Sequence, residues 1–235
     1  MTAFGRPRRH YRVADSTNER ARELAAAGAP SGTVVTAASQ IAGRGRRGRR
    51  WVAPAGTALL YSAILRDLDR GHGLLPLAVP VAVCEAIDSV APARCAIKWP
   101  NDVWIDERKV AGILIEARIP DWAVIGVGVN VAVPPEALPT DLRWPATSVG
   151  DGVGVEELRA ALDAALGRWV EAPREAVVEA FAERDALRGR AVSWEDGGAR
   201  SGTAAGTDSE GNLVVVLPGG GRAVLGAGEV SLVVG

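Results

Sequence analysis

The chain has 235 residues, a formal net charge of -1 and 48% hydrophobic residues, so it can bury the core of one large domain, or of one large and one small domain. The balanced charge argues against a dedicated binder of nucleic acids or membrane surfaces, which would carry an excess of one sign. No apolar run reaches the roughly 18 residues of a membrane helix, and the basic stretch from Met1 to Tyr11 lacks the apolar region of a secretory signal. We therefore expect a cytoplasmic protein without membrane contact.

Three reactive residue types are scarce. Only Lys98 and Lys109 are lysines among the 27 basic residues, and we hypothesise that a need for a compact charge on a flexible stem kept them. Cys84 and Cys95 lack CxxC spacing and are expected to be buried thiols in a reducing compartment. The two histidines are too few for a His-rich metal site or to favour a Ser/His/Asp triad.

The first two thirds of the chain predict a mixture of strands and helices. A strand is expected over 8–14, and a helix then begins with a capping box in which Ser16 is the N-cap and Glu19 is N3, and ends near Gly28. Residues 106–108 predict a hairpin turn. The other expected elements are strands over 33–38, 59–65, 94–98, 103–105, 110–117 and 122–129, a helix over 73–90, and a loop over 39–57.

The last third changes in character. A Pro-rich loop over 134–145 precedes a helical pattern over 155–186. After Gly189 come short β-rich pieces separated by Gly and Asp clusters, which suggest a small barrel packed on the larger domain. These strands are expected over 191–194, 203–207, 213–217, 223–225 and 230–234. We expect an α+β protein with domains over 1–186 and 187–235.

An Arg-rich loop is the first candidate site. It reads Gly43-Arg44-Gly45-Arg46-Arg47-Gly48 and matches the dinucleotide fingerprint GxGxxG, but the following residues include Pro54 and Gly56, so the helix that the fingerprint requires is not expected. The glycines let backbone amides approach a ligand, and the arginines supply bidentate donors for phosphate or carboxylate. A solvated basic loop or a nucleic-acid contact is the alternative.

Two further segments carry candidate residues. Lys98-Trp99-Pro100-Asn101-Asp102 and Lys109-Val110-Ala111-Gly112-Ile113 hold both lysines of the chain, although an isolated Asp–Lys pair is usually a surface salt bridge. Gly126-Val127-Gly128-Val129-Asn130 is an apolar strand whose glycines permit close approach, or else an ordinary core strand with a turn Asn. Gln40 and the Ser16-Thr17-Asn18 helix start are unremarkable taken alone.

Taken in order, these motifs resemble the biotin protein ligases, within a superfamily that also includes lipoyl and octanoyl transferases. The resemblance covers about residues 12–186, and the β-rich tail resembles the SH3-like C-terminal domain of that family. It implies a biotin/lipoate ligase-like catalytic domain with a mixed sheet and helices. The chain begins directly at this domain, so we expect the monofunctional type without the DNA-binding domain and without a role at DNA.

The resemblance implies formation of biotinyl-5'-AMP from biotin and ATP, with Mg2+, followed by transfer of biotin to a lysine of a biotin carboxyl carrier protein of acetyl-CoA carboxylase or a related complex. The residues implied to bind biotin are Ser16, Thr17, Asn18, Gln40, Gly43, Arg44, Gly45, Arg46, Lys109 and Gly112. Those implied to bind ATP are Arg46, Arg49, Trp51, Lys98, Asn101 and Asn130, with Asn130 also near Mg2+. Arg46, Lys109 and Asp102 are the implied catalytic residues, Asp102 orienting or deprotonating the acceptor lysine.

Two other functions stay open at this point. A lipoate ligase of the same superfamily would share the fold and a lysine that matches Lys109, and a nucleic-acid-binding module would use the Arg-rich loop. The octanoyl transferases use a Cys nucleophile, whereas Cys84 and Cys95 lie outside the motifs. Because the arginines of the Arg-rich loop repel one another, we expect residues 43–52 to be mobile without ligand and to fold over the adenylate.

Overall fold

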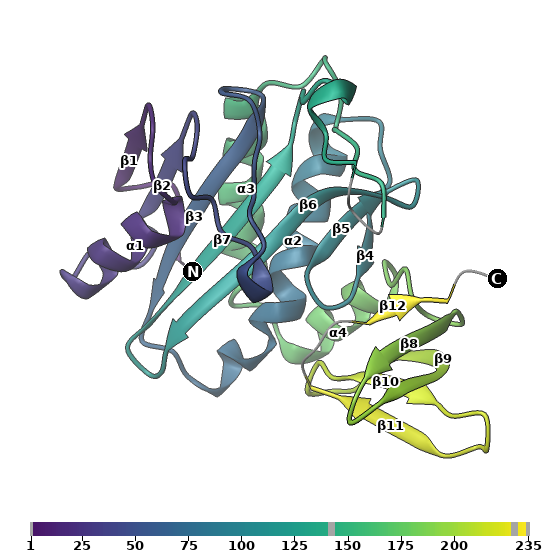
Figure 1. Cartoon of the computed structure of the whole chain (residues 1–235). Coiled ribbons are helices and arrows are strands. Elements are labelled where there is room, and N and C mark those ends of the chain that lie inside the picture. The colour runs from purple at the N-terminus through teal and green to yellow at the C-terminus, as the bar shows by residue number, and fades with distance from the viewer. Residues whose placement is uncertain (1, 141–143, 227–229, 234–235) are drawn as a thin grey trace.

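The computed structural model describes residues 2–140, 144–226 and 230–233, which form two β-sheets and four α-helices within these ranges (Figure 1). Residues 141–143 of the expected loop and Val234 of the expected last strand lie outside the described residues. The larger sheet carries the candidate motifs, and the smaller sheet contains the strands of the C-terminal tail.

The larger sheet is mixed, as the sequence predicts. In spatial order its strands are β1 (Arg8–Tyr11), β2 (Val34–Ala37), β3 (Ala58–Arg66), β7 (Trp122–Asn130), β6 (Arg108–Arg118), β5 (Asp102–Ile105) and β4 (Ala96–Lys98). Only β1 and β2 are paired in parallel in this sheet, and the other neighbours are antiparallel. The expected hairpin is present: Asp106 and Glu107 have φ values of 48° and 59°, which suits a tight two-residue turn between β5 and β6.

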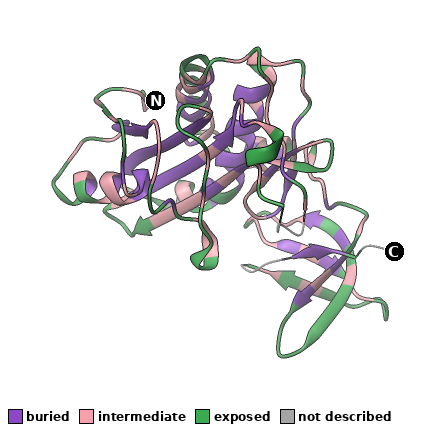
Figure 2. Cartoon of the chain, turned by 45° about the horizontal axis from the view of Figure 1, so that its top comes forward, coloured by how far each residue is buried: buried purple, intermediate pink, exposed green. Residues whose placement is uncertain are grey.

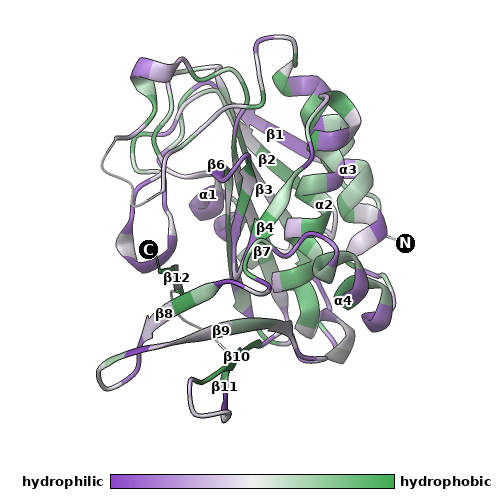
Figure 3. Ribbon diagram, turned by 90° about the vertical axis from the view of Figure 1, so that its right-hand side faces the viewer, coloured by the Kyte–Doolittle hydropathy of each residue, from purple (hydrophilic) through white to green (hydrophobic). Residues whose placement is uncertain are grey.

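Helices cover both faces of this sheet. Helices α2 (Leu75–Val90) and α3 (Val155–Trp169) lie on one face and α1 (Thr17–Ala26) lies on the other (Figure 3). Strand side chains alternate between the two faces, so Ile125, Val127 and Val129 of β7 join the large core under α2 and α3. The intervening residues of β7 face the side of α1, where the candidate motifs gather. The central strands are accordingly the most continuously buried part of the sheet (Figure 2).

The segment Gly71–Val90 is 20 residues long and, by length and composition, apolar enough to cross a membrane, which the sequence analysis did not anticipate. In the structure 67% of its most apolar window is buried inside the protein. A short 3-10 turn, η2 (Arg70–Leu74), precedes α2, and Pro76 occupies its first turn, where a missing N–H costs nothing. Contact with the sheet and with α3 therefore accounts for the apolar character of this helix.

Three sequence predictions about elements are wrong. The expected helix over 155–186 is two helices, α3 and α4 (Arg174–Ala182), because Pro173 disfavours helical backbone in the residue before it and instead forms the N-cap of α4. The strand expected over 8–14 ends at Tyr11, and Ala14 forms only an isolated bridge to Gln40. The capping box is absent, since Ser16 is the N-cap of α1 but its side chain makes no capping hydrogen bond.

The tail forms an antiparallel sheet, which is consistent with the expected small barrel. Its strands, in spatial order, are β11 (Arg222–Leu225), β10 (Leu213–Val216), β9 (Ala199–Thr207), β8 (Ala191–Glu195) and β12 (Ser231–Leu232). The indole of Trp99 donates to the Gly211 carbonyl at 3.1 Å, and buried tail residues such as Leu213 and Val192 join the large core. The tail sheet is thus packed on the main body, and a domain boundary between residues 186 and 187 stays a prediction.

Candidate active site

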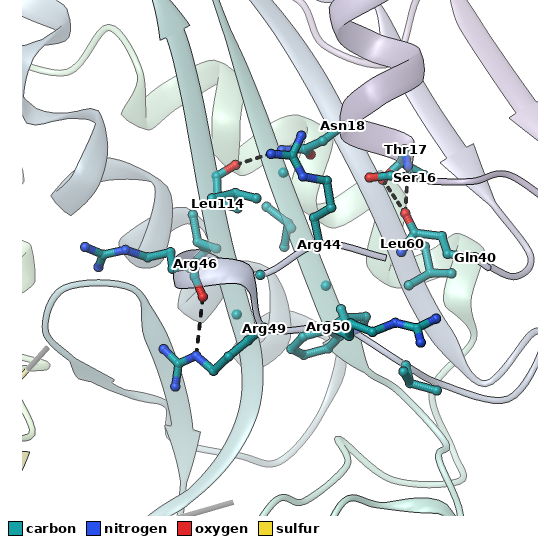
Figure 4. Close-up of a pocket in the computed structure, with 18 of the residues that line it drawn as sticks. Ser16, Thr17, Asn18, Gln40, Arg44, Arg46, Arg49, Arg50, Leu60 and Leu114 are labelled. Carbon is teal, nitrogen blue, oxygen red and sulfur yellow. Dashed lines mark hydrogen bonds between the residues drawn. The ribbon is translucent and has the colours of Figure 1, made fainter. Parts of the chain in front are cut away.

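A pocket lies on the α1 side of the larger sheet, between the start of α1, the Arg-rich loop and strands β6 and β7 (Figure 4). It brings together segments that are far apart in the sequence. The residues predicted for the site that line it are Ser16, Thr17, Asn18, Gln40, Arg44, Gly45, Arg46, Arg49, Trp51, Asn101, Lys109, Gly112 and Asn130. Three predicted residues, Gly43, Lys98 and Asp102, are outside the lining.

A pair of glycines forms the floor. Gly112 of β6 and Gly128 of β7 are register partners, and the indole of Trp51 lies against both. A Cβ added to Gly128 would lie 2.5 Å from Trp51 Cε2, and one added to Gly112 would lie 3.0 Å from Trp51 Cζ3. Only glycine therefore lets a flat aromatic ring lie this close to the strands. The ring Nε1 is buried, and no described residue is a hydrogen-bond partner for it.

One end of the pocket is built from short polar side chains. Gln40 Oε1 accepts the backbone N–H of Thr17 at 2.6 Å, and Thr17 Oγ1 lies 2.8 Å from the hydroxyl of Ser62. The Ser62 hydroxyl in turn donates to Asn18 Oδ1 at 2.7 Å. Ser62 is fully buried on β3 and was not recognised in the sequence, where it is one small residue in an apolar strand. These bonds fix the orientation of Thr17, Asn18 and Gln40.

The Arg-rich loop is folded as a small hairpin. Gly45 N–H donates to the Arg49 carbonyl at 2.7 Å, Trp51 N–H donates to Gly43 O at 3.1 Å, and a 3-10 turn, η1 (Arg46–Gly48), forms the tip. Gly43 is buried, and a Cβ there would lie 2.3 Å from the Trp51 carbonyl oxygen, which explains the glycine at a position outside the pocket lining. The ordering of this loop by ligand remains a prediction.

The loop arginines point in different directions (Figure 4). Arg44 points toward Asn18, whereas Arg46 and Arg49 extend toward the other end of the pocket. Arg46 Nη1 donates to Asn101 Oδ1 at 3.0 Å, and Asn101 Nδ2 donates to the Ile113 carbonyl at 3.1 Å. Asn101 thus links the Arg-rich loop to strand β6 through a fixed side-chain amide.

Lys109 is the cationic side chain that β6 contributes to the pocket lining. Its ammonium donates to Asp102 Oδ1 at 2.6 Å and lies 5.9 Å from the centroid of the Trp51 ring. Its backbone is held by Pro145 and Thr147, through hydrogen bonds of 2.8 and 2.9 Å. Asp102 is therefore engaged by Lys109 rather than exposed in the pocket, which argues for a positioning role.

Asn130, the last residue of β7, lines the end of the pocket that lies opposite the polar side chains of Thr17 and Gln40. Its Nδ2 donates to the Thr147 carbonyl at 3.0 Å, and no hydrogen bond to its Oδ1 is found within residues 2–140, 144–226 and 230–233. Among the described residues no group of three or more His, Cys, Asp or Glu side chains could hold a metal ion. Mg2+ often keeps water and phosphate ligands, so one amide oxygen fits an ion carried by a nucleotide but not a protein-built metal site.

Strand β3 is supported by a polar pair in which Tyr61 is buried and Asp163 is partly buried. The Tyr61 hydroxyl donates to Asp163 Oδ1 of α3 at 2.8 Å. Burial raises the pKa of the Tyr61 phenol well above its usual range, and burial also raises the pKa of Asp163. Arg159 forms an ion pair with the same carboxylate. This pair anchors α3 to the strand that carries Ser62.

Comparison with known proteins agrees with this geometry. The sequence profile of the Biotin/lipoate A/B protein ligase family matches residues 10–130. A biotin--[acetyl-CoA-carboxylase] ligase from Mycobacterium tuberculosis is 35% identical over 232 residues, which covers 92% of this chain and 85% of the relative. The chain belongs to the biotin/lipoate A/B protein ligase family.

Two other family members define how far the similarity extends. The bifunctional ligase/repressor BirA of Bacillus subtilis is 39% identical over 152 residues, which cover 62% of this chain and 46% of that protein, so the match spans about half its length. The structure of the biotin protein ligase from Aquifex aeolicus in complex with biotin and ATP superposes with a TM-score of 0.83 at 26% identity. That superposition covers 97% of this chain and 99% of the Aquifex chain, and it includes the tail sheet.

Proposed function

We propose that this family member is an ATP-dependent biotin protein ligase. A biotin carboxylate oxygen attacks the α-phosphorus of ATP, and the bond from the α-phosphorus to the oxygen that bridges to the β-phosphate breaks. Pyrophosphate departs, and biotinyl-5'-AMP is formed. The amine of an acceptor lysine then attacks the acyl carbon and AMP departs. The observation that carries the proposal is that one pocket is lined both by the cations Arg44, Arg46, Arg49 and Lys109 and, at one end, by a fixed cluster of polar side chains. The names of the relatives and the biotin and ATP in the Aquifex structure support it.

The cationic groups suit the first step because both reactants are anions. Two unit charges about 4 Å apart repel by roughly 1 kcal/mol in water and about 4 kcal/mol at an effective dielectric near 20, so a site that excludes water needs compensating cations. Lys109 and Arg46 are the proposed bridge between the biotin carboxylate and the α-phosphate. Asp102 positions the Lys109 ammonium, and Asn101 positions Arg46. In related phosphoryl chemistry one placed arginine is worth roughly a thousandfold or more in rate.

The polar cluster suits the ureido ring of biotin. A urea group offers one carbonyl acceptor and two N–H donors, which need a few directional partners in an otherwise apolar slot. Ser16, Thr17 and Gln40 supply hydroxyl and amide groups at one end of the pocket, and Leu60 and Leu114 supply apolar surface beside them. Arg44 would close over this end.

The nucleotide would lie at the other end. Trp51 on its glycine floor offers a flat surface for adenine, and Arg49 and Asn130 offer groups for the phosphates. Mg2+ would accompany the phosphates, with Asn130 Oδ1 as the nearest amide ligand. Lys98 is buried in β4 outside the pocket lining, so its proposed effect on ATP is indirect.

The proposed partner is a biotin carboxyl carrier protein of acetyl-CoA carboxylase or a related complex, and the proposed location is the cytoplasm. The amine of the acceptor lysine, whose unperturbed pKa is about 10.4, must lose a proton before it attacks. Asp102 could accept this proton only after its hydrogen bond with Lys109 is broken. We favour Asp102 as a positioning residue.

Lipoate ligation is the second candidate, because the family includes both activities. Calorimetric titration with biotin and with lipoate separates the two, since the ureido ring needs hydrogen-bond partners that a dithiolane ring does not use. Biotin binding that is tighter than lipoate binding is expected. Preference for lipoate would overturn the assignment. Tight and salt-sensitive binding of DNA or RNA would instead support the nucleic-acid function of the Arg-rich loop.

A further inference from the structure

A carboxylate on β6 links the polar end of the pocket to the Arg-rich loop. Glu116 lies on the same face of β6 as Gly112, four residues along the strand, and its side chain is 22% exposed. Glu116 Oε2 accepts from Asn18 Nδ2 at 2.9 Å, and Glu116 Oε1 lies 3.2 Å from Arg44 Nη1. Glu116 does not line the pocket itself.

Glu116 completes the hydrogen bonding of Asn18. The Asn18 side chain accepts from Ser62 and donates its two N–H groups to Glu116 and to the Leu114 carbonyl. Both Asn18 donors are therefore occupied by the protein. Gly126 makes room for this arrangement, since a Cβ there would lie 2.1 Å from Asn18 Oδ1. Asn18 connects through Ser62 to Thr17, so Glu116 stands at the end of a hydrogen-bonded series that begins at the pocket surface.

We infer that Glu116 is a positioning residue for biotin, an inference that rests on the proposed function. It sets the polar end of the pocket through Asn18 and holds Arg44 over the same end with its other oxygen. Arg22 Nη1 also lies 3.8 Å from Glu116 Oε1, so all three side chains around this carboxylate are donors. A carboxylate is the side chain that offers two acceptor oxygens and no donor. An amide at this position would turn an N–H toward Asn18 or toward Arg44. The requirement is thus for two acceptor oxygens at this position.

A neighbouring carboxylate provides a matched control. Glu19 of α1 contacts Arg44 at 3.4 Å and Arg22 at 3.0 Å, but among the described residues no hydrogen bond joins its side chain to that of Asn18. Replacement of Glu19 by Gln therefore perturbs the Arg44 contact and leaves the Asn18 series intact. Exposed ion pairs of this kind contribute little, so its effect should be small.

The test measures steady-state synthesis of biotinyl-5'-AMP by the full chain and by Glu116→Gln, Glu116→Asp and Glu19→Gln. We expect Glu116→Gln to raise the KM for biotin on the order of tenfold, as for loss of a hydrogen bond to a charged group, with the KM for ATP changed by less than about twofold. Glu116→Asp keeps two acceptor oxygens and should recover part of the loss. Glu19→Gln should stay within about twofold of the wild type.

The activity of the wild-type chain tests the proposed function, and the difference between the variants tests the role of Glu116. A wild-type chain that makes no biotinyl-5'-AMP refutes the function itself. A wild-type chain that makes it, combined with a Glu116→Gln variant of unchanged biotin KM, overturns the inference. Equal effects of Glu116→Gln and Glu19→Gln would also overturn it, because they would reduce the role to an Arg44 contact. Titration of the folded variants with biotin, after thermal melting has verified folding, gives the same comparison without turnover.

Discussion

The ammonium of Lys109 and the carboxylate of Asp102 are 2.6 Å apart, at the edge of a pocket that the lysine enters and the aspartate does not. The two residues lie on adjacent antiparallel strands, β6 and β5, so backbone hydrogen bonds fix their spacing. Lys109 is thereby oriented before any substrate arrives. Such pre-organisation is worth most in a site where charge develops during reaction.

Replacement of Lys109 by Ala should abolish adenylate synthesis. We expect Lys109→Ala to fold normally and to lose roughly a thousandfold or more in the rate of biotinyl-5'-AMP formation, because the cation between two anions is gone. Single-turnover formation of the adenylate measures this directly. Full retained activity would remove Lys109 from the mechanism.

Replacement of Asp102 by Asn separates positioning from base catalysis. If Asp102 positions Lys109, Asp102→Asn should slow adenylate formation and should slow biotin transfer from preformed adenylate much less. If Asp102 is the base for the acceptor lysine, the transfer step alone should slow, and its dependence on pH should change. Separate assays of the two half-reactions decide between the roles, and we expect the first pattern.

The glycine floor should be intolerant of a methyl group. Gly128→Ala would place a Cβ 2.5 Å from Trp51 Cε2, so the indole must shift away from the strands. We expect the KM for ATP to rise about two- to tenfold if Trp51 supports adenine, since stacked aromatic contacts contribute about 0.5–1.5 kcal/mol. Gly152→Ala is the matched control, because no heavy atom lies within 4 Å of its added Cβ. Equal ATP KM values in the two variants would refute the role of the floor.

An ion pair outside the site should give stability that depends on pH. The guanidinium of Arg8 binds both oxygens of Glu156 at 2.7 and 2.5 Å, and this lowers the pKa of Glu156 from 4.5 to about 2. A lowered carboxyl pKa stabilises the fold above the unfolded value of 4.5, and this contribution is lost as pH falls toward 2.

Glu156→Gln tests this linkage. Because the Glu156 side chain is 63% exposed, we expect a loss of no more than about 1 kcal/mol of unfolding free energy at pH 7. Urea unfolding at a series of pH values should show the difference from wild type shrinking between pH 4.5 and about 2. Glu157→Gln, at the adjacent position, is the control for a charge change on the same helix. A difference that is independent of pH would contradict the account.

The sequence predicted the parts of the site that depend on local pattern. The glycines and arginines of the loop, the turn before β6 and the β7 glycines all follow from short motifs. Ser16 is the N-cap of α1, as predicted, but the hydrogen bonds of the capping box are absent. The backbone N–H of Thr17 instead donates to Gln40, 23 residues away in the chain. Local sequence signals do not predict a contact of this kind between segments that are distant in the chain.

The contacts that the sequence did not predict join strands that are distant in the chain. Ser62 reaches Asn18 across 44 residues, and Arg46 reaches Asn101 across 55 residues. Such pairs depend on the strand order β3-β7-β6-β5, which no single motif specifies. Alternation along β6 could have placed Glu116 on the face of Gly112, but not beside Asn18.

The most direct test is transfer of biotin to a carrier domain, followed by intact mass. The full chain is incubated with biotin, ATP, Mg2+ and a biotin carboxyl carrier domain, with Lys109→Ala and omission of ATP as controls. We expect the carrier to gain the mass of one biotinyl group only with the wild-type chain and ATP. A carrier of unchanged mass, or a preference for lipoate on a lipoyl domain under the same conditions, would contradict the proposed function.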